Sequence, residues 1–187
     1  MSARPFRRAA APLLGLLLGL LLALPAHAIL QPGDRAPGFS APASLGGSVF
    51  TFALADALKK GPVVLYFYPK AFTQGCTIEA RLFAEATERF QALGATVIGV
   101  SGDDIETLKR FSVSECGGKF AVAADGDRAI MKSYDAVMVP GTSYAKRASY
   151  VIAPDGAIVY VYSDLAPDKH VENTLSALKA WRAQQKP

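Results

Sequence analysis

The segment from Val63 to Glu79 constrains the fold most, because it joins an apolar strand to a helix through a short loop. Residues 63–68 are all β-branched, aliphatic or aromatic, and a proline stands on each side of them. Such a run is typical of a strand covered on both faces. Apolar residues then recur at helical spacing as far as Leu93, and Gly94 follows as a stop signal. The apolar positions of this predicted helix are Ile78, Leu82, Phe83, Ala86, Phe90 and Leu93.

Cys76 falls in the first turn of the predicted helix. The first backbone N–H groups of a helix have no acceptor within the helix, and the helix dipole places positive charge at the same end. Both effects favour a thiolate over a thiol, and the thiolate is the nucleophilic form of cysteine. The pattern therefore predicts a reactive cysteine.

Strands and helices alternate along the rest of the chain, and Asp155-Gly156 between two apolar runs predicts a hairpin. This order is typical of an α/β protein with a mixed central sheet and helices on both faces. Periodicity alone does not separate a thioredoxin-like from a flavodoxin-like topology. The predicted strands cover residues 49–52, 95–101, 120–124, 149–153 and 157–162, and further helices begin near residues 104, 128 and 167.

Residues 1–28 have the three parts of a secretory signal peptide. Arginines come first, a mostly apolar run from Ala9 to Leu24 follows, and Ala26-His27-Ala28 supplies small residues at the cleavage position. The alternative is a membrane anchor, but this run is shorter than the roughly 20 residues that span a bilayer. We therefore expect an exported, periplasmic protein with no stable membrane insertion and one domain over residues 29–187.

Charge and motif content argue against several classes of function. The leader holds three of the 20 basic residues and no acidic ones, so 17 basic and 16 acidic residues remain after it. This near balance gives no reason to expect a nucleic-acid partner. The sequence also lacks a Gly-rich phosphate loop and a Cys-x-x-Cys pair. We expect neither a cofactor nor a metal.

The spacing Pro69-x-x-x-Thr73-x-x-Cys76 resembles the active-site signature of the peroxiredoxins. Cys76-Thr77-x-Glu79 is most similar to their Q-type, bacterioferritin-comigratory branch. Two further segments resemble the family's entry segment and its arginine-bearing strand, so the likeness covers nearly everything after residue 30. These segments are GDRAPGF at residues 33–39 and RASYVI at residues 147–152.

The resemblance implies a thioredoxin-like fold and a thiol-dependent peroxidase that reduces hydrogen peroxide and organic hydroperoxides. In that reaction the Cys76 thiolate attacks the terminal oxygen of the peroxide and becomes a sulfenic acid. By the same resemblance Thr73 would bind the peroxide and Pro69 would shield the sulfur from water. Arg147 would stabilise the thiolate and contact the peroxide.

Each of these residues also has a plain structural explanation. Thr73 is also a good helix N-cap, Pro69 is also a strand end, and Arg147 beside Lys146 is also read as a solvated charge. The alternative function is a non-catalytic thioredoxin-fold redox sensor or binding module, which needs Cys76 but not Thr73 and Arg147 together. His170 is the one histidine after the leader, and we expect it to face solvent.

Cys116 is the only other cysteine of the chain. Many Q-type peroxiredoxins have a second cysteine five residues after the first, where this chain has Arg81. The resemblance therefore implies that Cys116 resolves the sulfenic acid through a disulfide with Cys76, which a thioredoxin-like or glutaredoxin-like donor reduces. The opposing hypothesis is an inert buried thiol, because Cys116 lies near the apolar face of its helix. The sequence leaves the preferred peroxide open, and leaves open whether the protein is a monomer or a dimer.

Overall fold

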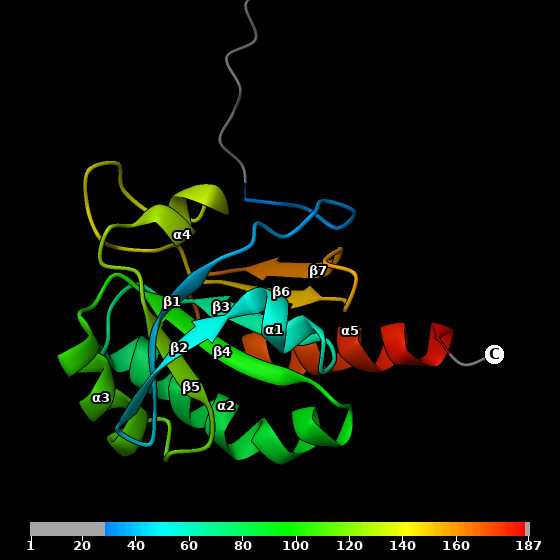
Figure 1. Cartoon of the computed structure of the whole chain (residues 1–187), viewed down its shortest axis with the longest axis horizontal. Coiled ribbons are helices and arrows are strands. Elements are labelled where there is room, and N and C mark those ends of the chain that lie inside the picture. The colour runs from blue at the N-terminus through cyan, green and yellow to red at the C-terminus, as the bar shows by residue number, and fades with distance from the viewer. Residues whose placement is uncertain (1–28, 186–187) are drawn as a thin grey trace, which may run out of the picture.

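A computed structural model describes residues 29–185 and shows a mixed sheet of seven strands with helices on both faces (Figure 1). The strand order is β2-β1-β5-β4-β3-β6-β7. Strand β3 pairs parallel with β4 and antiparallel with β6. The predicted mixed α/β sheet is therefore confirmed. The predicted signal peptide lies outside the described residues.

The elements follow one another with short connections. The strands are β1 (Ser40–Leu45), β2 (Ser48–Ala53), β3 (Val63–Phe67), β4 (Thr96–Ser101), β5 (Ala121–Ala124), β6 (Ala148–Ile152) and β7 (Ile158–Ser163). The helices are α1 (Leu54–Leu58), α2 (Gln74–Ala92), α3 (Ile105–Ser114), α4 (Ala129–Ser133) and α5 (His170–Gln184).

Strand β3 supplies both hydrophobic cores, because successive side chains of a strand point to opposite faces. Val63, Leu65 and Phe67 belong to the core beneath α1 and α4. Val64 and Tyr66 belong to the other core, with the buried faces of α2, α3 and α5. In Figure 1, α2, α3 and α5 lie on one side of the sheet and α4 lies on the other. Burial on both faces explains why this strand has no polar residue.

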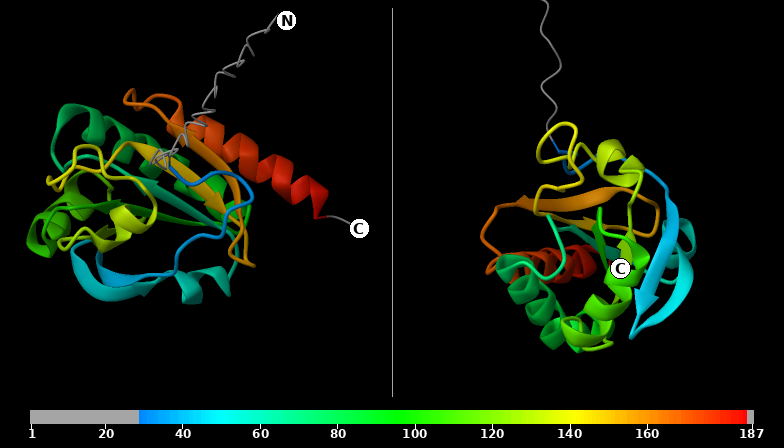
Figure 2. Two further views of the ribbon diagram at one scale, coloured as in Figure 1. Left: turned by 90° about the horizontal axis from the view of Figure 1, so that it is seen from above. Right: turned by 90° about the vertical axis from the view of Figure 1, so that its left-hand side faces the viewer.

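Two elements were not predicted from the sequence. Strand β1 contains Pro42 and mostly small residues, so its composition does not indicate a strand. It is stabilised by antiparallel pairing with β2 along its whole length and by further pairing with β5. The hairpin of β1 and β2 stands at one edge of the molecule in both views of Figure 2. The five-residue helix α1 follows β2 directly and was also missed.

The predicted boundaries of the other elements agree with the structure to within about three residues. Gly94 ends α2 with a left-handed backbone, φ 67°, and Gly156 at φ 87° makes the turn between β6 and β7. One assignment within α2 was wrong, because Ile78 is 40% exposed. None of the helices in residues 29–185 has the length and apolar character needed to cross a membrane.

Gly99 of β4 provides a test of how tightly the α2 side of the sheet is packed. A Cβ atom at this position would lie 2.8 Å from Cζ of Tyr66, whose buried ring stacks on Phe83 of α2. We predict that Gly99→Ala lowers the free energy of unfolding by about 1 to 3 kcal/mol, because the ring must move within a filled core. Urea unfolding followed by circular dichroism measures this loss.

Gly126→Ala is the matched control, since a Cβ atom there would meet nothing within 4 Å. Equal stability of the Gly99→Ala and Gly126→Ala proteins would show that the core yields to an added methyl group.

Candidate active site

The register of the sheet brings Arg147 to the sulfur of Cys76. Ala148 at the start of β6 lies opposite Phe67 at the end of β3, so Arg147 stands where β3 leads into α2. Its Nη2 atom donates to Sγ of Cys76 over 3.5 Å, across 71 residues of sequence. The structure therefore brings together two of the residues that the sequence singled out.

Cys76 is the third residue of α2 and is only 1% exposed. Thr73 occupies the N-cap position, but its hydroxyl donates to the backbone oxygen of Lys70 over 2.9 Å and makes no capping hydrogen bond. The positive end of the helix is therefore not neutralised by the side chain of its cap residue. A guanidinium donor and an open helix end therefore both lie at the sulfur.

The guanidinium of Arg147 is fixed by three further contacts. Its Nε donates to the backbone oxygen of Leu165 over 2.8 Å, and its Nη1 donates to Oε2 of Glu79. A Cβ atom at Gly75 would lie 3.0 Å from Nη2, so the guanidinium packs directly against the first turn of α2. Burial opposes the charge of Arg147, but Glu79 and Cys76 outweigh burial and raise the pKa of the guanidinium.

Glu79 has no exposed surface and lies one helical turn after Cys76. Burial raises the pKa of Glu79 to about 8, although the neighbouring Arg147 acts in the opposite direction. The sequence motif contained Glu79, but no role followed from it. The signal was the spacing of three residues from Cys76, which places both side chains on one face of a helix.

His170 does not face solvent, so that prediction was wrong. It is fully buried at the start of α5, with Nδ1 2.8 Å from Oγ of Ser149 and Nε2 3.0 Å from the backbone oxygen of Asp164. Burial lowers the pKa of His170 to about 4. The available signal was helical spacing, because His170 lies four and eight residues before the buried Thr174 and Leu178.

The loop between β3 and α2 holds Pro69 and Thr73 next to the cysteine helix. Asp103 accepts the backbone N–H of Ala71 over 2.8 Å and the hydroxyl of Ser101 over 2.8 Å, which ties this loop to the end of β4. Phe72 takes a left-handed backbone conformation, φ 64°, directly before Thr73. Pro69 is half-buried and Thr73 is exposed, so the threonine hydroxyl is accessible at the start of α2.

Cys116 lies just after α3, and both cysteines are free and buried. Burial, and secondarily Glu115, raise the pKa of the Cys116 thiol far above its ordinary value, so this sulfur is a thiol at neutral pH. Arg81 of α2 pairs with Glu115 at 2.8 Å. The arginine at the position of the usual second cysteine therefore contacts the residue next to Cys116.

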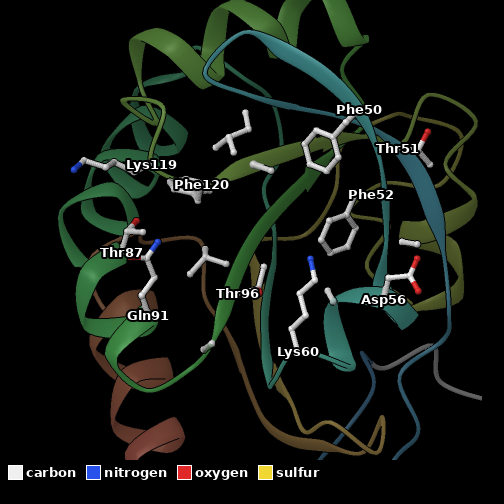
Figure 3. A pocket seen from close by; sticks show the side chains of 16 residues that line it. Phe50, Thr51, Phe52, Asp56, Lys60, Thr87, Gln91, Thr96, Lys119 and Phe120 are labelled. Carbon is white, nitrogen blue, oxygen red and sulfur yellow. The ribbon is translucent and has the colours of Figure 1, made fainter.

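A separate groove of about 480 Å³ lies away from these residues (Figure 3). Phe50 and Phe52 of β2 stand on one side of it, and Thr87 and Gln91 of α2 stand on the other. None of the five predicted site residues, Pro69, Thr73, Cys76, Cys116 and Arg147, lines this groove. The chemistry of the site is therefore not located there.

The buried acid and base give the stability a defined pH dependence. The pKa of Glu79 is about 8 in the folded protein and 4.5 ordinarily, and that of His170 is about 4 and 6.5. Between pH 6.5 and 8 the folded chain keeps one proton on Glu79 that the unfolded chain has lost. The free energy of unfolding therefore falls as pH rises, by about 1 to 2 kcal/mol across this window.

Between pH 4.5 and 6.5 the unfolded chain carries a proton on His170 and the folded chain carries one on Glu79. The two states bind the same number of protons, so this pair does not make the free energy of unfolding depend on pH in that window. Urea unfolding at pH 5.5, 6.5 and 8 of the native protein and of Glu79→Gln measures both windows. The glutamine variant should lose the fall above pH 6.5. A fall of equal size in both proteins would assign it to other groups.

Comparison with known proteins shows which family this chain resembles. The AhpC/TSA family profile matches residues 32–161. Peroxiredoxin Bcp of Xanthomonas campestris is 32% identical over 152 residues, which are 78% of this chain and 92% of that protein. The putative chloroplastic peroxiredoxin Q of Oryza sativa subsp. indica is 32% identical over 155 residues, which are 81% of this chain and 68% of the rice protein.

Solved structures agree with these sequence matches. The peroxidoxin BcpB of Mycobacterium tuberculosis superposes with a TM-score of 0.74 at 27% identity, over 81% of this chain and 97% of that one. PrxQ of Xylella fastidiosa, solved as a Cys-to-Ser mutant, superposes with a TM-score of 0.74 at 27% identity. The match covers 83% of this chain and 99% of that one. These likenesses confirm the thioredoxin-like fold. The chain belongs to the AhpC/TSA family and is a peroxiredoxin, a thiol-dependent peroxidase.

Proposed function

We propose that Cys76 is the peroxidatic residue and that it reduces hydrogen peroxide and organic hydroperoxides. The observation that carries this assignment is the donor contact of Arg147 to Sγ of Cys76, at the uncapped start of α2. A fixed charge beside a nucleophile acts without reorganisation during the reaction. Arg147 meets this condition because Glu79 and Leu165 hold its other donors.

The proposed reaction is a displacement at oxygen. The Cys76 thiolate attacks the terminal oxygen of the peroxide, the S–O bond forms and the O–O bond breaks. The sulfur is oxidised to a sulfenic acid, and the departing oxygen takes up a proton and leaves as water or an alcohol. The guanidinium of Arg147 offsets the negative charge that moves from sulfur to the departing oxygen.

We assign Thr73 and Pro69 to substrate binding and to protection of the sulfur. The hydroxyl of Thr73 lies at the exposed entrance of α2, where a peroxide arriving from solvent meets it. Pro69 offers no backbone N–H and lies half-buried in the loop between β3 and α2. Together they hold a small polar substrate close to a sulfur that is otherwise shielded from water.

We propose that Cys116 resolves the sulfenic acid. The ion pair of Arg81 with Glu115 holds the segment next to Cys116 against α2, five residues after Cys76. Five residues of helix rise by about 7.5 Å, so the segment next to Cys116 contacts α2 about that far along the helix from Cys76. The Cys116 thiol then attacks the sulfenic sulfur, a disulfide forms and water leaves.

The disulfide step requires local rearrangement, because both cysteines are buried as free thiols in the reduced protein. Gly117 and Gly118 follow Cys116 with left-handed backbones, φ 57° and 65°, so the end of α3 is built on residues with high conformational freedom. Loosening of this end and of the first turn of α2 would expose both sulfurs.

We further propose that residues 1–28 direct export to the periplasm and that an exported thioredoxin-like or glutaredoxin-like protein reduces the disulfide. The proposal for export rests on the charged, apolar and small-residue regions of the leader. The proposal for the donor follows from it, because a dithiol partner must reach the oxidised enzyme in the same compartment.

Removal of the sulfur or of its charge partner tests the first step. Cys76→Ser should abolish peroxide reduction, because a serine hydroxyl stays protonated at neutral pH. Arg147→Ala should slow oxidation of Cys76, because it raises the activation free energy by about 2 to 4 kcal/mol. This is the usual effect of removing one fixed donor that stabilises the charge of the transition state. Stopped-flow measurement of thiol oxidation by hydrogen peroxide gives both rates.

Arg89→Ala is the control for loss of an arginine, because Arg89 pairs with Glu172 at the surface. Its rate should equal that of the native protein. Equal rates in Arg147→Ala and Arg89→Ala would refute the role of Arg147, and peroxide consumption by Cys76→Ser would refute the mechanism.

The resolving role of Cys116 is tested by following the fate of the oxidised sulfur. Equimolar peroxide should convert the native protein into an intramolecular disulfide between Cys76 and Cys116. Cys116→Ser should react with the first peroxide at the native rate and then accumulate sulfenic and sulfinic acid at Cys76. Peptide mapping under non-reducing conditions distinguishes these products. Dimers joined through Cys76, or sulfinic acid alone in the native protein, would exclude Cys116 as the resolving residue.

A further inference from the structure

One carboxylate oxygen in the core of the site has no hydrogen-bond partner within residues 29–185. Oε2 of Glu79 accepts from Arg147, but Oε1 is buried and unpaired. The nearest charged or titratable group to it on α5 is His170, whose Nδ1 lies 3.5 Å away. A buried carboxylate oxygen without a donor destabilises the folded protein, so a proton between Oε1 and Nδ1 is favourable.

The surroundings of His170 fix which of its nitrogens carries the hydrogen. The backbone oxygen of Asp164 can only accept, so Nε2 at 3.0 Å must donate to it. In the neutral imidazole Nδ1 is then an acceptor, and it receives the hydroxyl of Ser149 at 2.8 Å. Nδ1 has a single lone pair, and Oε1 of Glu79 lies 3.5 Å from the same nitrogen. If Glu79 is ionised, two acceptors oppose each other inside the protein.

One proton on Oε1 removes this conflict, because the acid O–H then faces Nδ1 and shares its lone pair with the hydroxyl of Ser149. The other groups around the pair do not supply that proton. Arg147 on β6 is already a donor to Oε2, and the ring of Tyr162 on β7 packs against His170 with centroids 4.8 Å apart. Cys76 shares α2 with Glu79, and Asp164 contacts the imidazole through its backbone oxygen.

The charge of the buried cluster leads to the same protonation state. With a proton between Glu79 and His170, the remaining charges are the Cys76 thiolate and the Arg147 guanidinium, and their sum is zero. Without that proton, two anions compete for one guanidinium in a site from which water is excluded. Burial of a net charge is unfavourable, so thiolate formation and retention of the proton support each other.

We propose that His170 is a positioning residue for the peroxidase reaction: it keeps a proton on Glu79, and so leaves the charge of Arg147 available to the Cys76 thiolate. The inference rests on the proposed function of Cys76. The low pKa of His170, about 4, and the high pKa of Glu79, about 8, agree with a proton that stays on the acid. His170 acts through Glu79 and Arg147 and does not touch the substrate.

The consequence is a fall in reaction rate at alkaline pH. When Glu79 loses its proton, it becomes a carboxylate in full contact with Arg147 and draws the guanidinium charge away from the sulfur. The rate of Cys76 oxidation by hydrogen peroxide should therefore pass through a maximum and decline above the pKa of Glu79, which is about 8. Glu79→Gln should remove the decline whatever its rate at neutral pH, because an amide has no proton to lose.

His170→Asn tests the residue itself. The asparagine amide would donate to Oε1 in place of accepting from it, which favours the ionised form of Glu79. The decline should then begin at least about one pH unit lower. Thr174→Val is the matched control: Thr174 is buried on the same helix, but its hydroxyl donates only to backbone oxygens of His170 and Val171. Its pH profile should match that of the native protein.

A spectroscopic measurement on the full-length reduced protein decides the protonation state without any turnover. At pH 7 we expect the infrared C=O stretch of a protonated carboxylic acid that Glu79→Gln removes. In ¹⁵N-histidine NMR we expect a neutral His170 that is protonated at Nε2, identified by the signals missing from His170→Asn. A protein that fails to reduce peroxide but shows these signals would refute the function assigned to Cys76 and leave the shared proton in place. Absence of the carboxylic acid band, or an unchanged alkaline decline in a folded His170→Asn protein, would overturn the proposal.

Discussion

The site depends on a guanidinium that is almost removed from water. Arg147 is 5% exposed, and a charge in such a place is tolerated only when its donors are satisfied. The structure meets this requirement with a carboxyl group and a sulfur of α2 and with a carbonyl oxygen of the connection before α5. One planar side chain therefore holds together helix α2, the start of β6 and the connection before α5. The position of each segment is set by the atom that it presents to, or carries as, the guanidinium.

The central part of the fold could be predicted because its signals are local. The apolar run of β3, the helical spacing of α2 and the Asp155-Gly156 turn each specify their own structure within a few residues. Strand β1 could not be found in this way, since Pro42 and its small neighbours become a strand only through pairing with β2 and β5. Its conformation is decided by tertiary contacts and not by propensity.

In the candidate site, too, some residues could be predicted from local sequence and others depend on tertiary contacts. Cys76, Thr73 and Pro69 lie within one short motif, and Arg147 was recognisable from the segment around it. The environment of these residues was not recognisable. His170 is separated from Glu79 by about half of the chain, and the packing of α5 against α2, β6 and β7 makes it a buried neighbour rather than a surface residue. Periodicity indicates which face of a helix is covered, but it does not name the group that covers it.

Gly75, which carries no functional group, limits what the site can become. The first side-chain atom of any other residue at position 75 would lie 3.0 Å from Nη2 of Arg147, so the guanidinium would have to shift by a few tenths of an ångström. A substitution there would therefore disturb the contact of the arginine with the sulfur while every charged and sulfur-bearing residue remained unchanged. Damage at this glycine would then resemble damage to a catalytic group, although the glycine itself takes no part in the chemistry.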